Sequence, residues 1–309
     1  MSNLLEINNV TKKYGEFTAL NNVTLNIPKG SVFGLLGPNG AGKTSLIRII
    51  NQITLPDSGT ILLDGESLES SHIEQIGYLP EERGLYKSMK VGEQALYLAQ
   101  LKGLSKTEAK KRLKYWFDKF EIGAWWDKKI EELSKGMAQK VQFIVTVLHQ
   151  PKLLIFDEPF SGFDPINAQL IAKEILQLRD EGATIIFSTH RMESVEEMCD
   201  YIALINKSNK IVDGKLDDIK RQYRSNTFQI GLKTSNSKEI ETVLNQQFEV
   251  SPTDYRMLNE GFTANVKIPE NESPNGLISL LMKHGELQHF LELVPSANDI
   301  FIQAVHKNS

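Results

Sequence analysis

One stretch of eight residues constrains the fold of this chain more than any other. It reads Gly37-Pro38-Asn39-Gly40-Ala41-Gly42-Lys43-Thr44 and fits the pattern G-x-x-x-x-G-K-S/T. An apolar run of strand length, residues 31–36, precedes it, and residues 45–50 can continue as a helix. Glycines let such a backbone curl so that its N–H groups point at phosphate oxygens, and the helix N-terminus adds partial positive charge. The stretch predicts a phosphate-binding loop, in which Lys43 reaches the β- and γ-phosphates and the Thr44 hydroxyl ligates Mg²⁺.

Length, charge and cysteine content narrow the class of protein around this loop. A chain of 309 residues predicts two domains, and a net charge of −4 gives no overall attraction to nucleic acid. From residue 225 onward there are 6 Lys+Arg and 10 Asp+Glu, so this part is a poor partner for a phosphate backbone. The single cysteine, Cys199, excludes an internal disulfide and is expected to be a small buried side chain. Without a signal-like N-terminus or a run of about 18 apolar residues, we expect no membrane span.

The first two thirds of the chain predict a β-rich part followed by a helical insert. Strands are expected at 4–10 and 19–27, with Tyr14 in the loop between them, where it would stack on adenine or remain an exposed loop side chain. A turn is expected at 57–60. From about 88 to 150 the strand signals stop, and helical periodicity over 90–102 and 106–120 predicts a helical subdomain. Its tryptophans, expected in its core, are Trp116, Trp125 and Trp126.

Two acidic residues end the apolar run 152–156, which predicts a buried parallel strand. Asp157 and Glu158 are adjacent, so they face opposite sides of that strand. The carboxyl ends of strands in an open α/β sheet line its ligand crevice, which places both acids beside the phosphate loop. There one carboxylate can hold Mg²⁺, usually through water, and the other can polarise an attacking water. His190 follows the next predicted strand, 184–188, where it would contact the γ-phosphate or that water, or serve a structural role.

The pattern restarts near residue 226. Strands and helices alternate in the order βαββαβ, which fits a ferredoxin-like fold, and a last helix is expected at 298–305. The fold class predicted for the whole chain is therefore α/β: a P-loop NTPase core at 1–220, with its β-rich N-terminal subdomain and helical insert, and a small α+β accessory domain at 226–309. The elements expected in the second domain are strands at 228–232, 248–256, 262–268 and 287–293 and helices at 238–246 and 274–284.

Taken together, these motifs resemble the nucleotide-binding subunit of ABC transporters, and they come in that family's order. By this resemblance Tyr14 lies in the adenine-stacking loop and residues 37–44 are the Walker A loop. Residues 133–139 resemble the signature motif, 153–157 the Walker B strand and 161–164 the D-loop. Glu158 then takes the place of the catalytic glutamate and His190 that of the switch histidine. The resemblance covers residues 1 to about 220.

The resemblance implies an ATPase that uses ATP and Mg²⁺ and energises export through a separate membrane permease. The subunit would be cytoplasmic and peripheral on the inner face of the membrane, with no nucleic-acid partner. It would act as a head-to-tail dimer, expected to be a homodimer, in which the signature of one subunit completes the ATP site of the other. Expected catalytic residues are Lys43, Glu158 and His190, and expected metal ligands are Thr44, Glu81 and Asp157. The residues expected to contact the nucleotide are Tyr14, Gly37, Pro38, Asn39, Gly40, Ala41, Gly42, Lys43, Thr44, Ser45, Ser134, Gly136 and Gln139.

Two departures from the family's pattern stand out. The signature reads Leu-Ser-Lys-Gly-Met, where the family favours Leu-Ser-Gly-Gly-Gln, yet Ser134 and Gly136 remain to cap a γ-phosphate. The Q-loop position carries Glu81 in place of glutamine, which adds a negative charge beside phosphate. Residues 77–86 and 295–301 resemble a bacterial subgroup that works with ABC-2-type permeases, including sodium-exporter-like systems.

Other functions stay open at this stage. A soluble ABC ATPase of DNA repair or translation is one, although long coiled coils or tandem cassettes are not found here. A P-loop GTPase is another, because Asn206-Lys207-Ser208-Asn209 begins like the guanine-reading N-K-x-D, but Asn209 replaces the aspartate. The C-terminal domain would either sense a small ligand or serve as a dimerisation or packing module.

Overall fold

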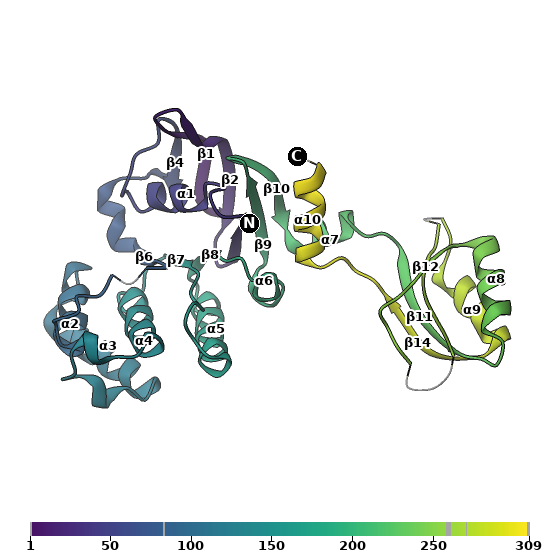
Figure 1. The fold of residues 1–309 in the computed structure, drawn as a ribbon. Coiled ribbons are helices and arrows are strands. Elements are labelled where there is room, and N and C mark those ends of the chain that lie inside the picture. Colours follow the sequence, from purple (N-terminus) through teal and green to yellow (C-terminus); the bar gives the residue numbers. More distant parts are fainter. Residues whose placement is uncertain (1, 83, 258–260, 270, 308–309) are drawn as a thin grey trace. The chain divides into compact units, whose positions relative to one another are not determined.

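A computed structural model describes residues 2–82, 84–257, 261–269 and 271–307 (Figure 1). The chain forms two compact units. One contains the residues up to Leu216 together with those from Phe301 onward, and the other is Asp217–Ile300. Helix α10, Ala297–Lys307, begins in the second unit and continues into the first.

The chain begins with an antiparallel sheet of strand order β2-β1-β4-β5. β1 continues to Tyr14, four residues beyond the predicted end, because Tyr14 pairs with Phe17 across the two-residue turn Gly15-Glu16. Gly15 has φ +59, which such a turn favours. The turn predicted at 57–60 was too long, since β4 already begins at Ser58. The strands are β1 (Asn3–Tyr14), β2 (Phe17–Pro28), β4 (Ser58–Leu63) and β5 (Glu66–Ser67).

A second, six-stranded sheet has the order β10-β9-β3-β8-β7-β6, and all of it is parallel except the edge strand β10. Every residue of its central strands β3, β7 and β8 is buried, which explains their uninterrupted apolar sequences. Asn206 pairs with Asn209 to close the β9–β10 hairpin, so the partial N-K-x-D match lies in a tight turn. The strands are β3 (Val32–Leu36), β6 (Ile76–Leu79), β7 (Leu153–Asp157), β8 (Thr184–Ser188), β9 (Tyr201–Asn206) and β10 (Asn209–Lys215).

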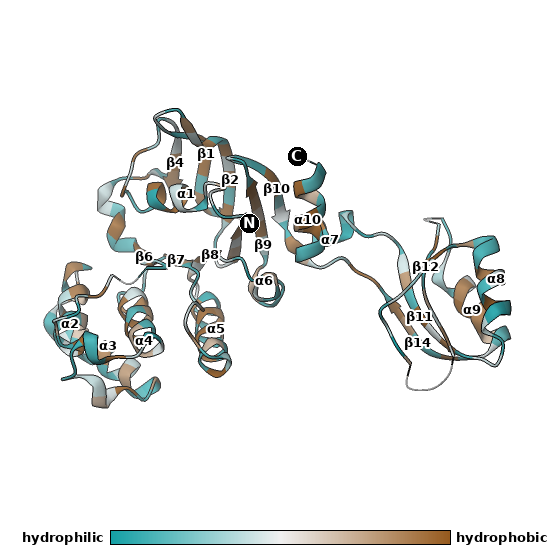
Figure 2. Cartoon of the chain, viewed as in Figure 1, coloured by the Kyte–Doolittle hydropathy of each residue, from teal (hydrophilic) through white to brown (hydrophobic). Residues whose placement is uncertain are grey.

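Helices cover both faces of this parallel sheet. α1 lies between the two sheets, where its apolar side joins the core, whereas α4, α5 and α6 lie on the opposite face (Figure 1). The helices are two-sided, with hydrophobic and hydrophilic residues alternating around their turns (Figure 2). The helices of the first unit are α1 (Lys43–Ile50), α2 (Val91–Leu101), α3 (Lys106–Lys119), α4 (Lys135–Val147), α5 (Pro165–Asp180) and α6 (Met192–Met198), with short 3-10 helices η1 (Ser70–Gln75), η2 (Gly123–Trp125) and η3 (Ile130–Glu132). α7 (Leu216–Gln222) begins at Leu216 and continues into the second unit.

Aromatic side chains pack together in the helical insert, but of the three tryptophans predicted in its core only Trp116 is buried, and Trp125 is partly exposed. Trp116 is buried and packs edge-on against Phe143, which in turn stacks on Phe156 of β7. Trp126 is partly exposed and lies so close to Gly92 that a Cβ there would meet its ring at 2.2 Å. The insert therefore has its own aromatic core, continuous with the parallel sheet. Cys199, directly after α6, is buried, and this burial raises the pKa of its thiol.

The second unit is a four-stranded antiparallel sheet of order β12-β13-β11-β14 with two helices. β11 and β12, the two strands joined by α8, are separated by β13, which is the split βαβ arrangement predicted for a ferredoxin-like fold. β12 is shorter than expected. The segment after it is fastened to the sheet by a hydrogen bond from Gln229 to Thr253 and by stacking of Tyr255 on His289. The elements are β11 (Thr227–Lys233), α8 (Ser237–Gln247), β12 (Glu249–Ser251), β13 (Phe262–Lys267), α9 (Pro274–His284) and β14 (Glu286–Glu292).

Candidate functional site

The predicted phosphate loop joins the end of β3 to the first residue of α1. A Cβ at Gly37 would lie 2.2 Å from the Ile205 carbonyl oxygen, and one at Gly42 would lie 2.2 Å from that of Ala19. Both residues also have positive φ, +148 and +117, so glycine is required at each position for lack of space and for its backbone conformation. Gly42 is the N-cap of α1 and offers no side chain to its first N–H groups. These groups are left for an anion.

Lys43 points back over the loop that it follows. Its Nζ donates to the carbonyl oxygens of Gly37, at 2.6 Å, and of Pro38, at 3.2 Å. Burial lowers the pKa of Lys43, and the charges of Asp157, Glu158 and Glu81 partly offset this effect. The Lys43 ammonium group therefore lies in a polar site, where it bonds to the loop carbonyls and feels the charges of the three nearby carboxylates.

An open cavity of about 370 Å³ unites several predicted residues from distant parts of the sequence. The phosphate loop, the start of β2, the segment after β6 and the carboxyl ends of β7 and β8 all contribute residues to its lining. Gly37, Pro38, Tyr14 and His190 do not belong to the lining, nor do Ser134, Gly136 and Gln139 of the predicted signature, as far as the described residues show. The lining residues are Phe17, Ala19, Asn39, Gly40, Ala41, Gly42, Lys43, Thr44, Ser45, Glu81, Asp157, Glu158 and Ser188.

The two acids after the buried strand occupy different environments. Asp157 is the last residue of β7 and is buried, and burial raises the pKa of its carboxyl, with the charges of Glu158 and Glu81 acting in the same direction. Glu158 has a positive φ of +49, and its N–H donates to the Ser188 carbonyl oxygen at 2.8 Å. The chain therefore turns sharply directly after Asp157, while both carboxylates stay at the cavity.

His190 contacts Glu158 directly. Glu158 Oε1 accepts from the His190 N–H at 2.8 Å and lies 2.7 Å from Nδ1 of the same residue. Thr189 Oγ1 donates to Glu158 Oε2 at 3.2 Å. The imidazole is 73% exposed and the Glu158 side chain only 13%. The histidine thus forms an outer cover on a carboxylate whose position is fixed by three hydrogen-bonding groups.

The predicted signature residues lie at the start of α4, away from the cavity lining. Ser134 is the N-cap of α4, and its side chain accepts from the Met137 N–H at 3.2 Å. A Cβ at Gly162 would meet the stem of Lys135 at 2.4 Å, so Lys135 lies across the turn before α5. Gln139 is 2% exposed, and its Nε2 has no hydrogen-bond partner among the described residues.

Sequence reasoning missed four residues at or near the cavity: Phe17, Ala19, Ser188 and Thr189. Phe17 lines it, whereas Tyr14, its partner across the hairpin, stands 45% exposed with the Lys12 ammonium 5.5 Å from its ring. Ser188 lines the cavity and Thr189 holds Glu158. The signal for the last two was available, because β8 is a neighbour of β7 and its carboxyl end must reach the same edge. For Phe17, the only sequence feature that could have predicted its place in the lining is its closeness to a turn glycine.

The metal expected at this site depends on few donors. Two carboxylates and one hydroxyl, from Glu81, Asp157 and Thr44, line the cavity, and all are the hard oxygen donors that Mg²⁺ prefers. Within the described ranges there is no cluster of three or more His, Cys, Asp or Glu side chains that would hold a metal ion alone. A phosphate-bound cation with few protein ligands fits this donor set.

A phosphate loop at the carboxyl edge of a parallel sheet, facing two strand-terminal carboxylates, defines a P-loop nucleotide hydrolase. Residues 20–161 match the family model described as ABC transporter, and residues 214–305 match that of the ATP-binding protein DrrA1-3-like, C-terminal domain. The chain belongs to the ABC transporter ATP-binding proteins, and its first domain is an ATPase of that family. No described helix is long and apolar enough to cross a membrane.

Similarity to individual proteins covers from 70% to 98% of the chain. The uncharacterized ABC transporter ATP-binding protein YhaQ of Bacillus subtilis (strain 168) is 40% identical over 302 residues, which cover 98% of each chain. The linearmycin resistance ATP-binding protein LnrL of the same organism is 35% identical over 219 residues, 70% of each chain. Among solved structures, an ATP-binding subunit of an ABC transporter is 32% identical with a TM-score of 0.67, covering 71% of this chain and 93% of that one.

Proposed function

We propose that this subunit hydrolyses Mg²⁺-bound ATP in the cavity beside the phosphate loop and that this drives export through a membrane permease. The observation that carries the proposal is the convergence of Lys43, Asp157 and Glu158 at one cavity, although more than a hundred residues separate the loop from the acids. One relative, LnrL, is described as a resistance protein, and removal of a toxic compound is the simplest route from transport to resistance.

Each part of the cavity has a proposed role. The loop residues 39–44, which line the cavity, bind the phosphates through backbone N–H groups, and Lys43 neutralises their negative charge. Thr44, Asp157 and Glu81 hold Mg²⁺, which when bound offsets further phosphate charge. Glu158 accepts the proton of the attacking water, and His190, 2.7 Å from it, keeps that carboxylate in place.

The nucleotide site is proposed to be completed by a second subunit. Ser134 and Gly136 stand at the N-terminus of α4, where N–H groups and a hydroxyl suit a γ-phosphate, yet they do not line the cavity of their own chain. In a head-to-tail dimer, expected to be a homodimer, they would cap the nucleotide of the partner subunit. Tyr14 and Phe17, exposed together at the hairpin tip, are proposed to flank the adenine.

Replacing Glu158 by glutamine tests the assignment of the base. Glutamine keeps the shape of the side chain but accepts no proton, so turnover should fall by about a hundredfold or more. ATP affinity should persist, and an ATP-bound dimer should accumulate on size-exclusion chromatography. Glu193→Gln, on the surface of α6, is the matched control. Wild-type turnover in the Glu158 variant would remove Glu158 from the mechanism.

We propose that the permease contacts a groove between α2 and α4. This groove of about 210 Å³ is walled by Tyr78, Leu98 and Leu101, and Leu101 is 60% exposed. At its base, Gln142 Oε1 and His149 Nδ1 are buried without hydrogen-bond partners in the described part of the chain. Burial lowers the pKa of His149 to about 4, so its ring is neutral at pH 7, and its Nε2 lies 3.3 Å from the Ile76 carbonyl oxygen.

The groove lies one residue away from the nucleotide cavity along the chain. Pro80 lines the groove and Glu81 lines the cavity, so a permease segment seated there would contact the chain next to the nucleotide. Leu101→Glu should abolish co-purification with the permease while the ATPase activity of the isolated subunit is kept. Ile166→Glu, also an exposed apolar residue but on α5, is the control. Unchanged co-purification of the Leu101 variant would place the permease elsewhere.

A further inference from the structure

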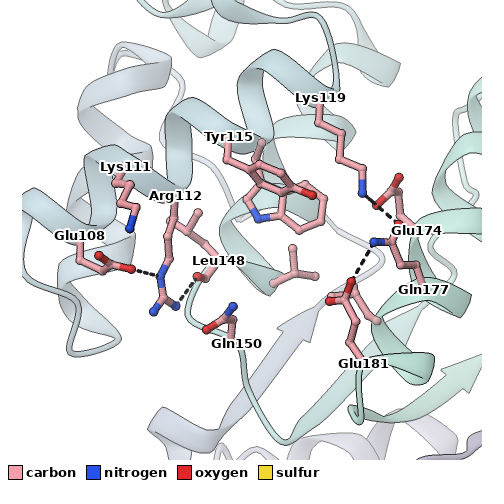
Figure 3. A pocket seen from close by; sticks show the side chains of 13 residues that line it. Glu108, Lys111, Arg112, Tyr115, Lys119, Leu148, Gln150, Glu174, Gln177 and Glu181 are labelled. Atoms are coloured by element: carbon pink, nitrogen blue, oxygen red, sulfur yellow. Dashed lines mark hydrogen bonds and ion pairs between the residues drawn. The ribbon is translucent and has the colours of Figure 1, made fainter.

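A cavity of about 400 Å³ separates the helical insert from α5 of the parallel-sheet core (Figure 3). α3 and the end of α4 form one side of it, and α5 forms the other. Close apolar packing is what normally fixes one element against another, and a void of this size interrupts it here. Packing of α4 on β7 joins the insert to the sheet, and the contacts that cross from α3 to α5 set its position against that helix.

One buried ion pair makes that crossing. Lys119 Nζ of α3 lies 2.5 Å from Glu174 Oε2 and 3.1 Å from Gln177 Oε1, both on α5 (Figure 3). The Glu174 side chain is only 4% exposed, so its charge needs this partner. Burial alone lowers the pKa of Lys119, but the hydrogen bond and charge of Glu174 outweigh it and raise the pKa. Its ammonium also lies 5.2 Å from the centre of the Trp116 ring.

A second contact fastens the other end of α5. The stem of Lys135, next to Ser134, lies across Gly162 in the turn that leads into α5. From Pro165 at the start of the helix to Glu174 is a distance of about 14 Å at 1.5 Å per residue. α5 is thus joined to the insert at two separated points, one beside Ser134 and one at Lys119. Two such points define the orientation of one body on another, whereas a single point leaves it free to pivot.

We propose that Lys119 and Glu174 are a positioning pair, which sets where Ser134 and Gly136 stand relative to the Glu158 edge of the same chain. This inference rests on the proposed function. One chain offers its phosphate loop to one nucleotide and its signature to another. The spacing between these two half-sites must be correct for both sites of a dimer to close together, and the pair fixes that spacing without touching nucleotide.

The test compares turnover with ATP affinity in the full-length chain. Lys119→Met and Glu174→Gln should each lower kcat by about tenfold, because a small misplacement of a distant catalytic group is costly. The Kd for ATP should stay within about twofold of wild type, since the phosphate loop is untouched. Lys119→Arg keeps the charge and should retain most of the activity. If Lys119 acted only through packing, the change of side-chain shape in this variant would lower the activity as well.

Glu108→Gln is the matched control, because Glu108 pairs with Arg112 at 2.7 Å inside α3 and does not cross the cavity (Figure 3). Its kcat should be that of wild type. Thermal unfolding is followed for every variant. If Glu174→Gln does not fold, Gln177→Leu replaces it, since it removes only the second bond to Lys119 and should lower kcat by about threefold.

The outcomes separate this inference from the function on which it rests. A wild-type chain that neither binds nor hydrolyses ATP would contradict the proposed function itself. With an active wild type, unchanged kcat in the folded Lys119 and Glu174 variants would overturn the positioning role alone. An equal loss in Glu108→Gln, or a parallel loss of ATP affinity, would overturn it as well.

Discussion

The two regions proposed to contact one nucleotide are built in opposite ways. The phosphate loop lies in a concave site, with Asp157 and Glu158 across from it and its glycines fitted against the Ile205 and Ala19 carbonyls. The signature, Ser134 to Gln139, begins a helix whose N-terminal residues line no part of that cavity, and its charged residue Lys135 packs on Gly162. One region is complete within the chain and the other is not.

This difference indicates which functions a single chain can perform. We propose that the loop can bind phosphate within one chain, because its N–H groups and Lys43 are already assembled and Mg²⁺ would offset the charge of the nearby acids. The signature, by the same proposal, contacts a nucleotide only when a partner subunit brings one. We therefore expect changes in the loop to affect binding by one chain, and changes in the signature to affect only what requires two chains.

The largest effect is expected at Lys43. Lys43→Ala removes the one ammonium group that lines the cavity described here, and charged hydrogen bonds of this kind are worth enough to weaken ATP binding by about 10- to 100-fold. Kd measured on the isolated full-length subunit tests this. Lys29→Ala, which breaks only a surface pair with Asp64, is the control. Undiminished ATP affinity of the Lys43 variant would contradict the phosphate-loop assignment. The loop and the signature could then no longer be distinguished by which of them binds ATP within one chain.

A smaller, more selective effect is expected at Ser134. Ser134→Ala should lower turnover without changing ATP affinity, but it also removes a helix cap worth about 1 kcal/mol of stability. Ser105→Ala supplies a closely matched control, because Ser105 caps α3 through the same 3.2 Å bond to a third-residue N–H. Both variants should lose similar stability in thermal unfolding, and only the Ser134 variant should lose ATPase activity. Equal ATPase activity in the Ser134 and Ser105 variants would mean that Ser134 acts only as a helix cap.

Mixing the two defective chains sharpens the comparison further. In a head-to-tail dimer of Lys43→Ala with Ser134→Ala, one site contains both defects and the other contains neither. Random pairing should then recover about a quarter of wild-type turnover, although each variant alone is nearly inactive. If each chain formed its whole site alone, mixing would recover nothing beyond the average of the two.

The sequence predicted the elements of this site better than their mutual contacts. Motif spacing sufficed for the loop and the acids, because a parallel sheet brings the ends of β3, β7 and β8 to one edge whatever the loops do. Serine is favoured as a helix N-cap and proline in the first helical turn, and Ser134 of α4 and Pro165 of α5 occupy those positions. Local rules of this kind need no knowledge of the tertiary structure.

Contacts between distant segments were beyond such rules. Nothing in the sequence pairs Lys119 with Glu174, or places Phe17 in the cavity lining in preference to Tyr14. The extension of β1 to Tyr14 depended on pairing across a two-residue turn, which a period-two pattern of the single strand does not register. These features arise from packing between elements, and single-sequence patterns describe one element at a time.

The smallest expected effect concerns Glu81, which lines the cavity where the family has glutamine. Glu81→Gln removes a metal-ligating carboxylate and also one negative charge near phosphate. The Mg²⁺ concentration for half-maximal ATPase activity should therefore rise by a few fold, while ATP binding without Mg²⁺ should tighten by a similar factor, on the order of 1 kcal/mol for a solvent-exposed charge. Glu82→Gln is the matched control, since Glu82 does not line the cavity. A higher half-maximal Mg²⁺ concentration together with tighter Mg²⁺-free ATP binding would indicate that the Glu81 carboxylate acts on both the cation and the phosphate. If neither the Mg²⁺ dependence nor the ATP affinity changes, Glu81 has no role in binding. The loop region would then bind ATP through Lys43 and the backbone alone.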